Sequence, residues 1–394
     1  MQLAHKIKLR PTAKQANYFA RACGTARFVW NWALDEWNRQ YAEGGKPNAN
    51  TLDVQFNAVK RELCPWALEV GKDAAQRAID NLGAAYQRFF AKKAQRPKFK
   101  KKGRSRDSFY ISNDQFKVSG KYIRIPKLGW VRMSEPLRFA GKIMSATIGR
   151  QADWWYVSIS VRMPDSKPAK PAGAPVGVDL GFNAFATLST GEKIEAPKPL
   201  KKYKKLLRRR SQQVSRKQPG SHRHHEAKRK LSRVQFKIAS IRRDFIHKLT
   251  TRLSKNHAEV CVEDLCVKGL AKGRFSRSIA DAGFHEFRRQ LSYKSLLYGS
   301  TLTVRDRFFP SSKMCSTCGH VLDMLPLSAR SWICPVCGAD HDRDVNAAKN
   351  LLNPNLPVGD RDVKPVETEA LTAVPAVKLR SMKREQDTIC QPVG

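Results

Sequence analysis

Four cysteines in two closely spaced pairs constrain the fold of this chain more than any other feature. Cys315 and Cys318 form the first pair, fifteen residues follow, and Cys334 and Cys337 form the second pair. This spacing is typical of a ribbon or knuckle that holds a zinc ion in four thiolates. A glycine after each pair permits the tight turn that brings both thiolates to one metal. Because a four-cysteine site is closed, we expect one structural Zn²⁺ without a catalytic role.

The alternatives for these four thiols are two disulfide bonds or no partnership at all. Disulfides are typical of secreted proteins, and the opening residues lack the apolar segment of a signal peptide. The zinc site is therefore the favoured interpretation. The other cysteines have no ligand spacing, and we expect them to be buried thiols: Cys23, Cys64, Cys261, Cys266 and Cys390.

A large positive charge limits the partners of the chain. Its 394 residues include 74 Lys and Arg against 34 Asp and Glu, a net charge of +40. This excess favours a polyanion, because each neutralised phosphate releases condensed counterions. A membrane surface would call for cations beside an exposed apolar helix face, whereas here they are spread along the chain between core-like segments. No apolar run approaches the roughly 18 to 20 residues of a membrane span, so we expect a soluble cytoplasmic protein that binds nucleic acid.

The first part of the chain begins with helical patterns. Thr12 and Gln15 have the spacing of a capping box at the start of a helix. Aromatic and small apolar residues recur at helical spacing over Trp30–Tyr41 and over Ile79–Phe89. We therefore expect a helical bundle over residues 12–94, with the aromatic stripe as its core.

A period of two replaces the helical pattern from about Ser108. It is clearest at Trp155, Val157, Ile159 and Val161, and it predicts a β unit, a small barrel. The opening strand, His5–Leu9, can pair with this unit. The helical bundle would then be an insertion between strands.

A linker rich in proline separates this part from the rest, over Pro164–Pro175. Beyond it, short strands alternate with helices. The expected strands lie in Val176–Ser189 around a turn, Ala258–Leu265 and Leu302–Arg307, and the expected helices are a basic hairpin over Leu200–Ser254, Phe284–Tyr298 and Asp344–Leu352. The last residues lack any period and are predicted to be disordered.

Three carboxylates stand where a charge is costly. Asp179 ends an apolar strand, Glu263 lies in an otherwise apolar strand, and Asp344 opens a helix. Each alone could be the ion-pair partner of an arginine. Together, in a chain with a polyanionic partner, they predict carboxylates around two divalent cations about 3.5 to 4 Å apart that hydrolyse a phosphodiester bond. Hard oxygen ligands suit Mg²⁺ or Mn²⁺.

These motifs, in this order, resemble the TnpB family, the transposon-encoded relatives of type V CRISPR effectors. The resemblance rests on Gly177-Val-Asp179-Leu-Gly, Val262-Glu263-Asp-Leu, residues 310–319 and Asp342-Arg-Asp344-Val-Asn-Ala-Ala-Lys-Asn. Thr25–Asn31 and Arg96–Lys100, leading to Ser108-Phe109, extend it over about residues 1–353.

The resemblance implies an RNA-guided DNA endonuclease of a bacterium or archaeon, cytoplasmic and associated with the nucleoid when on DNA. One protein would bind one guide RNA from the transposon end, and the guide would pair with double-stranded target DNA beside a short motif that the protein reads. The nuclease would be RNase H-like (RuvC), with Asp179, Glu263 and Asp344 as catalytic Mg²⁺ ligands in a single site.

Two other functions are compatible with the same patterns. A nuclease-inactive, RNA-guided DNA-binding transcriptional repressor would be expected to lack one or more of the acids, and all three are present. An unguided junction resolvase or RNase H-like nuclease is disfavoured by the large N-terminal units.

The expected fold is multidomain α+β. An N-terminal β-barrel with an inserted helical bundle precedes an RNase H-like α/β nuclease domain with an inserted four-cysteine zinc module. The expected boundaries are residues 1–10 and 105–165 for the barrel (wedge) domain, 11–104 for the helical recognition domain, 166–175 for the linker, 176–314 and 341–364 for the nuclease domain, 315–340 for the zinc module and 365–394 for the tail.

Two strongly basic segments are predicted to contact the phosphates of RNA and of the RNA–DNA hybrid. The candidate contacts are Lys98, Lys100, Lys101, Lys102, Arg104, Arg208, Arg209 and Arg210.

Overall fold

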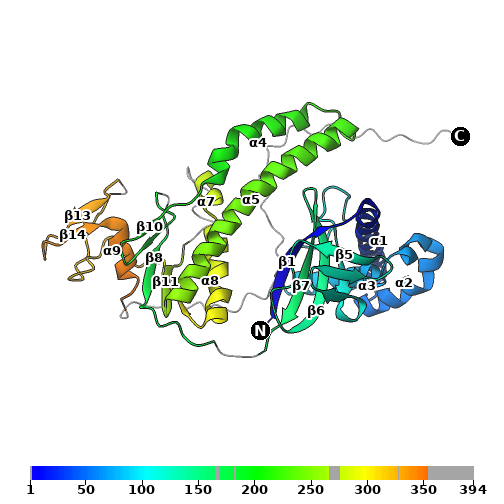
Figure 1. Ribbon diagram of the computed structural model, residues 1–394, viewed down its shortest axis with the longest axis horizontal. Coiled ribbons are helices and arrows are strands. Elements are labelled where there is room, and N and C mark those ends of the chain that lie inside the picture. The colour runs from blue at the N-terminus through cyan, green and yellow to red at the C-terminus, as the bar shows by residue number, and fades with distance from the viewer. Residues whose placement is uncertain (1, 165–167, 182, 266–275, 327, 354–394) are drawn as a thin grey trace. The chain divides into compact units, whose positions relative to one another are not determined.

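The computed structural model of the chain describes residues 2–164, 168–181, 183–265, 276–326 and 328–353 (Figure 1). The predicted tail, Cys266 and Cys390 lie outside these residues. No helix in the described ranges combines the length and the apolar character needed to cross a membrane.

The chain divides into two compact units. Unit 1 comprises Met1–Ser166 and Gln213–Phe236, and unit 2 comprises Lys167–Gln212 and Lys237–Gly394. The first division point falls at the predicted proline-rich linker. Two long helices, α4 (Pro199–Ser215) and α5 (His222–Asn256), contribute residues to both units and form the predicted basic hairpin.

Unit 1 contains a seven-stranded sheet in the order β2-β6-β7-β1-β5-β4-β3. Its strands are β1 (Gln2–Arg10), β2 (Ser108–Ser112), β3 (Lys117–Ser119), β4 (Tyr122–Ile125), β5 (Gly129–Met133), β6 (Lys142–Gln151) and β7 (Trp154–Arg162). The opening strand β1 pairs with β7 over Gln2–Lys8 and with β5 at Leu9 and Arg10. The prediction that it joins the later β unit is confirmed.

The predicted barrel is not supported by this sheet. β2 and β3 are its end strands and do not pair with each other in the described part of the chain, whereas a barrel requires closure between its first and last strands. The period of two did identify the inward face: Val157, Ile159 and Val161 are fully buried and Trp155 nearly so. Alternation fixes which side chains point inward, but it leaves the pairing of the edges open.

Three helices form the predicted bundle in unit 1. They are α1 (Ala13–Ala42), α2 (Ala49–Leu63) and α3 (Asp73–Phe90), with short 3-10 turns η1 (Pro65–Glu69) and η2 (Asn113–Gln115). Both hydrogen bonds of the predicted capping box are present between Thr12 and Gln15. Trp37 and Tyr86 stack with their ring centroids 4.3 Å apart, which confirms the aromatic core. Tyr41, in the last turn of α1, is instead 61% exposed.

Unit 2 contains a five-stranded sheet in the order β10-β9-β8-β11-β12. Its strands are β8 (Val176–Asp179), β9 (Ala186–Leu188), β10 (Lys193–Ile194), β11 (Glu259–Glu263) and β12 (Thr301–Arg305), and its other helices are α7 (Ser276–Ala282), α8 (Phe284–Tyr298) and α9 (Arg343–Asn350). The strands β8, β11 and β12 run parallel, β9 pairs antiparallel with β8, and β10 pairs antiparallel with β9. A separate pair, β13 (Ser331–Ile333) and β14 (Asp340–Asp342), belongs to the cysteine-rich segment.

The two faces of this sheet have different coverings. Val176 and Val178 belong to the core built with α5 and α8, where the Phe185 ring lies 5.4 Å from that of Phe287. Because side chains alternate along a strand, Gly177 and Asp179 face the other side. That side is covered by α9, which packs on β8 and β9.

Candidate functional site

The three predicted acids converge on one edge of the unit 2 sheet. Val178 of β8 pairs with Val262 of the parallel strand β11, so Asp179 and Glu263 are the next residues on adjacent strands. The alternation of side chains places both acids on the face that α9 covers. Asp344 is the second residue of α9, and its negative charge acts on the carboxyl of Asp179.

A glycine on β8 allows α9 to approach this closely. A Cβ atom on Gly177 would lie 1.8 Å from the carbonyl oxygen of Ala348 in α9, far inside any van der Waals contact. Ala347 and Ala348 are fully buried, so small residues on both elements bring the two backbones together. The Gly-x-Asp pattern of β8 therefore serves packing at its first position and the acid site at its third.

The start of α9 is fixed by Asp342. Its Oδ1 atom accepts hydrogen bonds from the backbone N–H groups of Asp344 and Val345, both at 3.1 Å, and the Lys193 ammonium donates to its other oxygen at 2.6 Å. This is N-terminal capping, which satisfies donors that the helix itself leaves unpaired. The cap sets the helix start and with it the position of Asp344.

The acids share an electrostatic environment that favours a cation. Burial, and then the negative charges of Glu263 and Asp344, raise the pKa of Asp179 to about 7, against a partial opposing effect of Arg343. Burial and the charge of Asp264 raise the pKa of Glu263. Carboxylates forced together in this way are stabilised by a divalent cation, which inverts the local preference for protonation.

The carboxylates are not a tight cluster around a single point. Among the residues that the structure describes, only the four cysteines have their ligand atoms all within 4.8 Å of one another. Two ions about 4 Å apart can each take different carboxylates, so a wider spacing suits a two-ion site better than a one-ion site. The oxygen donors of the three acids fit Mg²⁺ or Mn²⁺ by their chemistry.

The ion-pair alternative applies to a neighbour and not to the acids themselves. Asp264 pairs with both Arg288 and Arg307, and these bonds outweigh burial and lower the pKa of its carboxyl. In the described residues, Asp179, Glu263 and Asp344 form no ion pair. Three carboxylates without an ion pair, two of which have a raised pKa, favour a bound cation at this edge of the sheet.

The four predicted zinc ligands come together as expected. Their Sγ atoms lie within 4.8 Å of one another, with Cys315 and Cys337 3.6 Å apart and Cys318 and Cys334 also 3.6 Å apart. The glycines after each pair, Gly319 and Gly338, have positive φ angles of 79° and 70°. Four thiols in this arrangement can hold one metal ion, and their chemistry fits Zn²⁺.

The four thiols differ in how readily they take the charged form that binds metal: the pKa is lowered at Cys315 and Cys334 and raised at Cys318 and Cys337. Although burial opposes it, hydrogen bonds from the backbone N–H groups of Cys318 and Thr317 and from His341 lower the pKa of Cys315 to about 5. The Nε2 atom of His341 lies 3.0 Å from Cys315 Sγ, and its ring lies 4.7 Å from that of Trp332. Sequence spacing did not identify His341, because it stands outside the two cysteine pairs.

Two asparagines tie the cysteine-rich segment to α9. The Asn346 side chain donates to Met314 O at 2.7 Å and accepts from Ser316 N at 2.9 Å. One turn later, the Asn350 amide donates to Ser311 O and Met314 O. Both asparagines are almost fully buried. The sequence contains a signal for these contacts. Asn346 and Asn350 are four residues apart and so lie on one helix face, and such side chains are costly to bury without hydrogen-bond partners.

The other described cysteines, Cys23, Cys64 and Cys261, are free and buried as predicted. Burial is the main reason for the raised pKa of each thiol.

The first basic segment is held against α1 by its backbone. Trp30 Nε1 donates to Lys98 O at 3.1 Å, and Asn31 both donates to Lys100 O and accepts from Lys100 N. The ammonium of Lys100 lies over the Trp30 ring, 3.5 Å from its centroid. Burial and the charge of Arg27 lower the pKa of Lys100 to about 8. Lys100 thus packs against α1 in this structure, and its contact with phosphate stays a prediction.

The other candidate contacts differ in exposure. Arg210 in α4 is half-buried. The exposed members of the set are Lys98, Lys101, Lys102, Arg104, Arg208 and Arg209.

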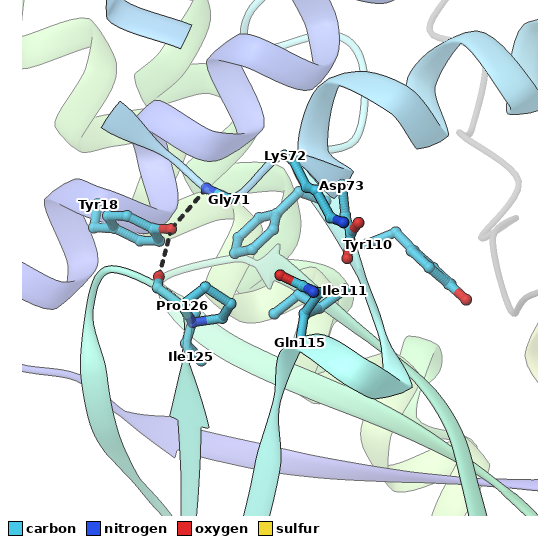
Figure 2. A pocket seen from close by; sticks show the side chains of 10 residues that line it. Tyr18, Gly71, Lys72, Asp73, Tyr110, Ile111, Gln115, Ile125 and Pro126 are labelled. Carbon is cyan, nitrogen blue, oxygen red and sulfur yellow. Dashed lines mark hydrogen bonds between the residues drawn. The ribbon is translucent and has the colours of Figure 1, made fainter. Parts of the chain in front are cut away.

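A small pocket in unit 1 is structural. Figure 2 shows Tyr18 directing its hydroxyl toward Gly71 and Pro126; the hydroxyl accepts from Gly71 N at 3.0 Å and donates to Pro126 O at 2.9 Å. The pocket has a volume of about 10 Å³, room for about one water. None of the three acids lines it.

Three family models match the chain. One described as a probable transposase covers residues 158–274, and one described as a Cas12f1-like TNB domain covers residues 284–351. Between them they include all three acids and all four metal-binding cysteines. A third, described as a helix-turn-helix domain, matches residues 1–46, which here form β1 and the single long helix α1.

Relatives match along nearly the whole chain. A putative RNA-guided DNA endonuclease of Streptomyces pristinaespiralis is 38% identical over 360 residues, covering 90% of this chain and 89% of the relative. The putative RNA-guided DNA endonuclease InsQ of Escherichia coli is 34% identical over 370 residues, covering 89% and 91%. TnpB-like protein L79 of Acanthamoeba polyphaga mimivirus is 25% identical over 195 residues, 46% of this chain and 37% of the relative.

The fold also matches a solved structure. The Cas12f1 chain in a cryo-EM structure of a Cas12f1-sgRNA-target DNA complex aligns with a TM-score of 0.55 at 15% identity, covering 88% of this chain and 84% of that one. This match shows a common multidomain fold. The extent and identity of the bacterial relatives establish that the chain belongs to the TnpB family of putative RNA-guided DNA endonucleases.

Proposed function

We propose that this protein is an RNA-guided DNA endonuclease that cuts target DNA by metal-dependent hydrolysis at Asp179, Glu263 and Asp344. The observation that carries the proposal is the convergence of these unpaired carboxylates at one sheet edge in a chain of net charge +40. The names of the bacterial relatives support the same activity.

The strand order of unit 2 supports an RNase H-like (RuvC) nuclease domain. Three antiparallel strands, β10, β9 and β8, continue into the parallel strands β11 and β12. Asp179 and Glu263 stand at the carboxyl ends of β8 and β11, where open α/β sheets commonly bind ligands. We assign residues 176–314 and 341–364 to this domain, 315–340 to the zinc module, and 1–10 with 105–165 and 11–104 to the wedge and helical domains.

Each of the three acids would have its own role at this site. Asp179 and Glu263 would hold cations from the rigid sheet, and Asp344 would complete the set from the capped start of α9. Two Mg²⁺ ions bound there would activate the attacking water and stabilise the leaving oxygen of the phosphodiester. No side chain among the three acids is needed as a nucleophile, so the implied reaction is hydrolysis.

The four cysteines would hold one structural Zn²⁺ apart from the reaction. The module that they form contacts the helix that carries Asp344 through the hydrogen bond from Ser316 N to Asn346, and the Met314 and Ser311 carbonyls just before the module accept from Asn346 and Asn350. The partners of the whole protein would be a guide RNA from the transposon end, bound one to one, and double-stranded target DNA in a bacterial or archaeal cytoplasm.

The test uses the full protein purified with the RNA that its own locus encodes. A DNA duplex that matches the guide and carries a randomised flank is added with Mg²⁺, and cleaved molecules are sequenced. We expect cleavage beside a short flanking motif, dependent on the guide and lost in Asp179→Ala. Guide-dependent binding that leaves the DNA intact would instead identify a guided repressor, and cleavage without a guide match would identify an unguided nuclease.

A further inference from the structure

One face of the unit 1 sheet combines exposed aromatic rings with unpaired cations. The strands β4 and β5 turn Ile123, Ile125, Val131 and Met133 into the core, where each is at most 2% exposed, and β3 packs the partly buried Val118 against it. The alternate residues therefore point outward. We call the outward set the aromatic–basic face: Arg10, Lys117, Tyr122, Arg124, Trp130 and Arg132.

Strand register arranges this face in two rows. In one row, Lys117 pairs with Arg124, and Arg124 pairs with Trp130. In the other, Tyr122 pairs with Arg132, and Arg132 pairs with Arg10 of β1. Directly paired residues on one face are about 4.5 to 5.5 Å apart between Cβ atoms. Each aromatic ring therefore has an arginine directly beside it.

The cations and rings of this face make no ion pair or ring contact among the described residues. No Asp or Glu occurs between Lys117 and Met133. In the part of the chain that the structure describes, none of the four cations of the two rows forms an ion pair. Tyr122 is 47% exposed and Trp130 is 48% exposed, and neither ring contacts another ring or a cation there.

This combination matches an unpaired nucleic acid strand. Bases stack on exposed aromatic rings whatever their sequence, and the phosphates between them need cations at short intervals. A base-paired duplex hides the faces of its bases, so it could use the cations but not the rings. A protein partner would have to supply several acids to match these arginines, and the rings would then add only apolar contact.

We propose that the aromatic–basic face binds an unpaired segment of RNA by stacking bases on Tyr122 and Trp130 while Arg10, Lys117, Arg124 and Arg132 contact its phosphates. The choice of RNA rests on the proposed function, in which RNA is the permanently bound partner. The three acids that DNA must reach all belong to unit 2, whereas this face belongs entirely to unit 1.

The experiment measures binding of full-length protein, freed of co-purified nucleic acid, to a labelled RNA of about 12 nucleotides. The RNA contains only adenine and cytosine, so it cannot pair with itself. The same RNA annealed to its complement and a DNA of the same sequence serve as comparison probes. Raised salt weakens contacts to phosphate across the whole basic surface, which leaves the stacking contribution visible.

We expect Tyr122→Ala and Trp130→Ala each to weaken binding of the single-stranded RNA about tenfold, with little effect on the duplex. Trp130→Phe should retain most of the affinity, because it keeps a ring. Arg124→Gln and Arg132→Gln should each lower the salt dependence by about one phosphate contact for every nucleic acid tested.

The matched control is Trp66→Ala. Trp66 is another exposed tryptophan of unit 1, 42% exposed, and it lies outside the face. Equal losses in Trp66→Ala and Trp130→Ala, equal losses for single-stranded and duplex RNA, or no loss at all would each overturn the proposal. A loss confined to the DNA probe would overturn the assignment to RNA.

The outcome can be separated from that of the proposed nuclease. Asp179→Ala should bind the RNA probe as the unaltered protein does, so a failure of cleavage would leave the binding result intact. Conversely, guide-dependent cleavage with no effect of Tyr122→Ala and Trp130→Ala on RNA binding would refute only the proposal that the aromatic–basic face binds RNA.

Discussion

The imidazole Nε2 of His341 lies 3.0 Å from the Sγ of Cys315, and both side chains are buried. A histidine in this place donates to the thiolate and holds its orientation, as groups around metal ligands commonly do. It adds a fifth functional residue to a site that the cysteine spacing alone describes with four.

His341→Ala should therefore weaken zinc binding by about tenfold to a hundredfold. Competition with a chromogenic zinc chelator measures the change in affinity. The control is His285→Ala, because His285 is exposed and belongs to α8, outside the module. Equal zinc affinity in the two variants would show that His341 only fills space beside Trp332.

Gly177→Ala should disrupt the packing of α9 on β8, because the added methyl group would overlap the backbone of Ala348. Overpacking of this kind costs about 1 to 3 kcal/mol or more, and we expect target cleavage to fall with it, since Asp344 moves with α9. Chemical denaturation and a cleavage assay measure the two effects.

Gly24→Ala is the matched control for that substitution. Gly24 lies inside α1 with nothing within 4 Å of an added Cβ, so alanine should stabilise the helix by about 0.5 to 1 kcal/mol. Similar behaviour of the two alanine variants would contradict the close approach of α9 and β8.

Asp179→Asn should abolish cleavage, retain RNA binding and stabilise the protein in magnesium-free buffer. The pKa of Asp179 is raised to about 7 from 3.8, so between about pH 4 and pH 7 the folded state holds a proton that the unfolded chain releases. Stability therefore falls as pH rises through that window. Asparagine removes this loss, and we expect a gain of about 1 to 3 kcal/mol near pH 8 that vanishes near pH 4.

Denaturation of both proteins at the two pH values tests this expectation, with zinc retained throughout. Added Mg²⁺ should narrow the difference near pH 8, because it stabilises only the protein that keeps the carboxylate. An unaltered protein that is as stable as the variant near pH 8 without Mg²⁺ would mean that Asp179 is not under electrostatic strain.

Asn31→Ala should release the first basic segment from α1. The Asn31 side chain makes two hydrogen bonds to the backbone of Lys100, each contributing about 0.5 to 1.5 kcal/mol. Trypsin cuts after Lys and Arg, so faster tryptic cleavage between Arg96 and Arg104 would report the release.

Asn57→Ala serves as the control in the same assay. Asn57 is exposed on α2 and bonds only to side chains of its own helix. If the basic segment is cut equally fast in both variants, the contact between Asn31 and Lys100 does not hold it.

The positions of the three candidate acids can be chosen from the sequence because their signals are local, and their role as metal ligands stays a prediction. An acid at the end of an apolar strand, an acid within another and a capped helix each follow from a few neighbouring residues, and parallel pairing then brings Asp179 and Glu263 to one edge. The cysteine pairs are local in the same sense. The chemistry that the three acids and the four cysteines can support follows from their residue types. Little knowledge of tertiary contacts is therefore needed to propose it.

Other features depend on contacts that no local pattern encodes. The position of Lys100 over Trp30 and the contact between His341 and Cys315 join residues that are distant in sequence or lie outside any motif. The open edges of the unit 1 sheet depend on which strands pair, which the local pattern does not state. The residues of a basic segment look alike in sequence, yet they differ in the folded chain, because one of them, Lys100, packs against α1. The aromatic–basic face likewise emerges only when strand register sets its two rows side by side.

The asparagine contacts between α9 and the cysteine-rich segment imply that the proposed nuclease site depends on the proposed zinc site. A chain that lacks zinc would lose the support that Asn346 and Asn350 give to the helix of Asp344, while the sheet and helices of unit 1 contain none of these ligands. Protein made under zinc starvation would then carry its RNA but leave DNA uncut. A transposon that depends on this enzyme would thus have its cutting limited by the zinc status of its host.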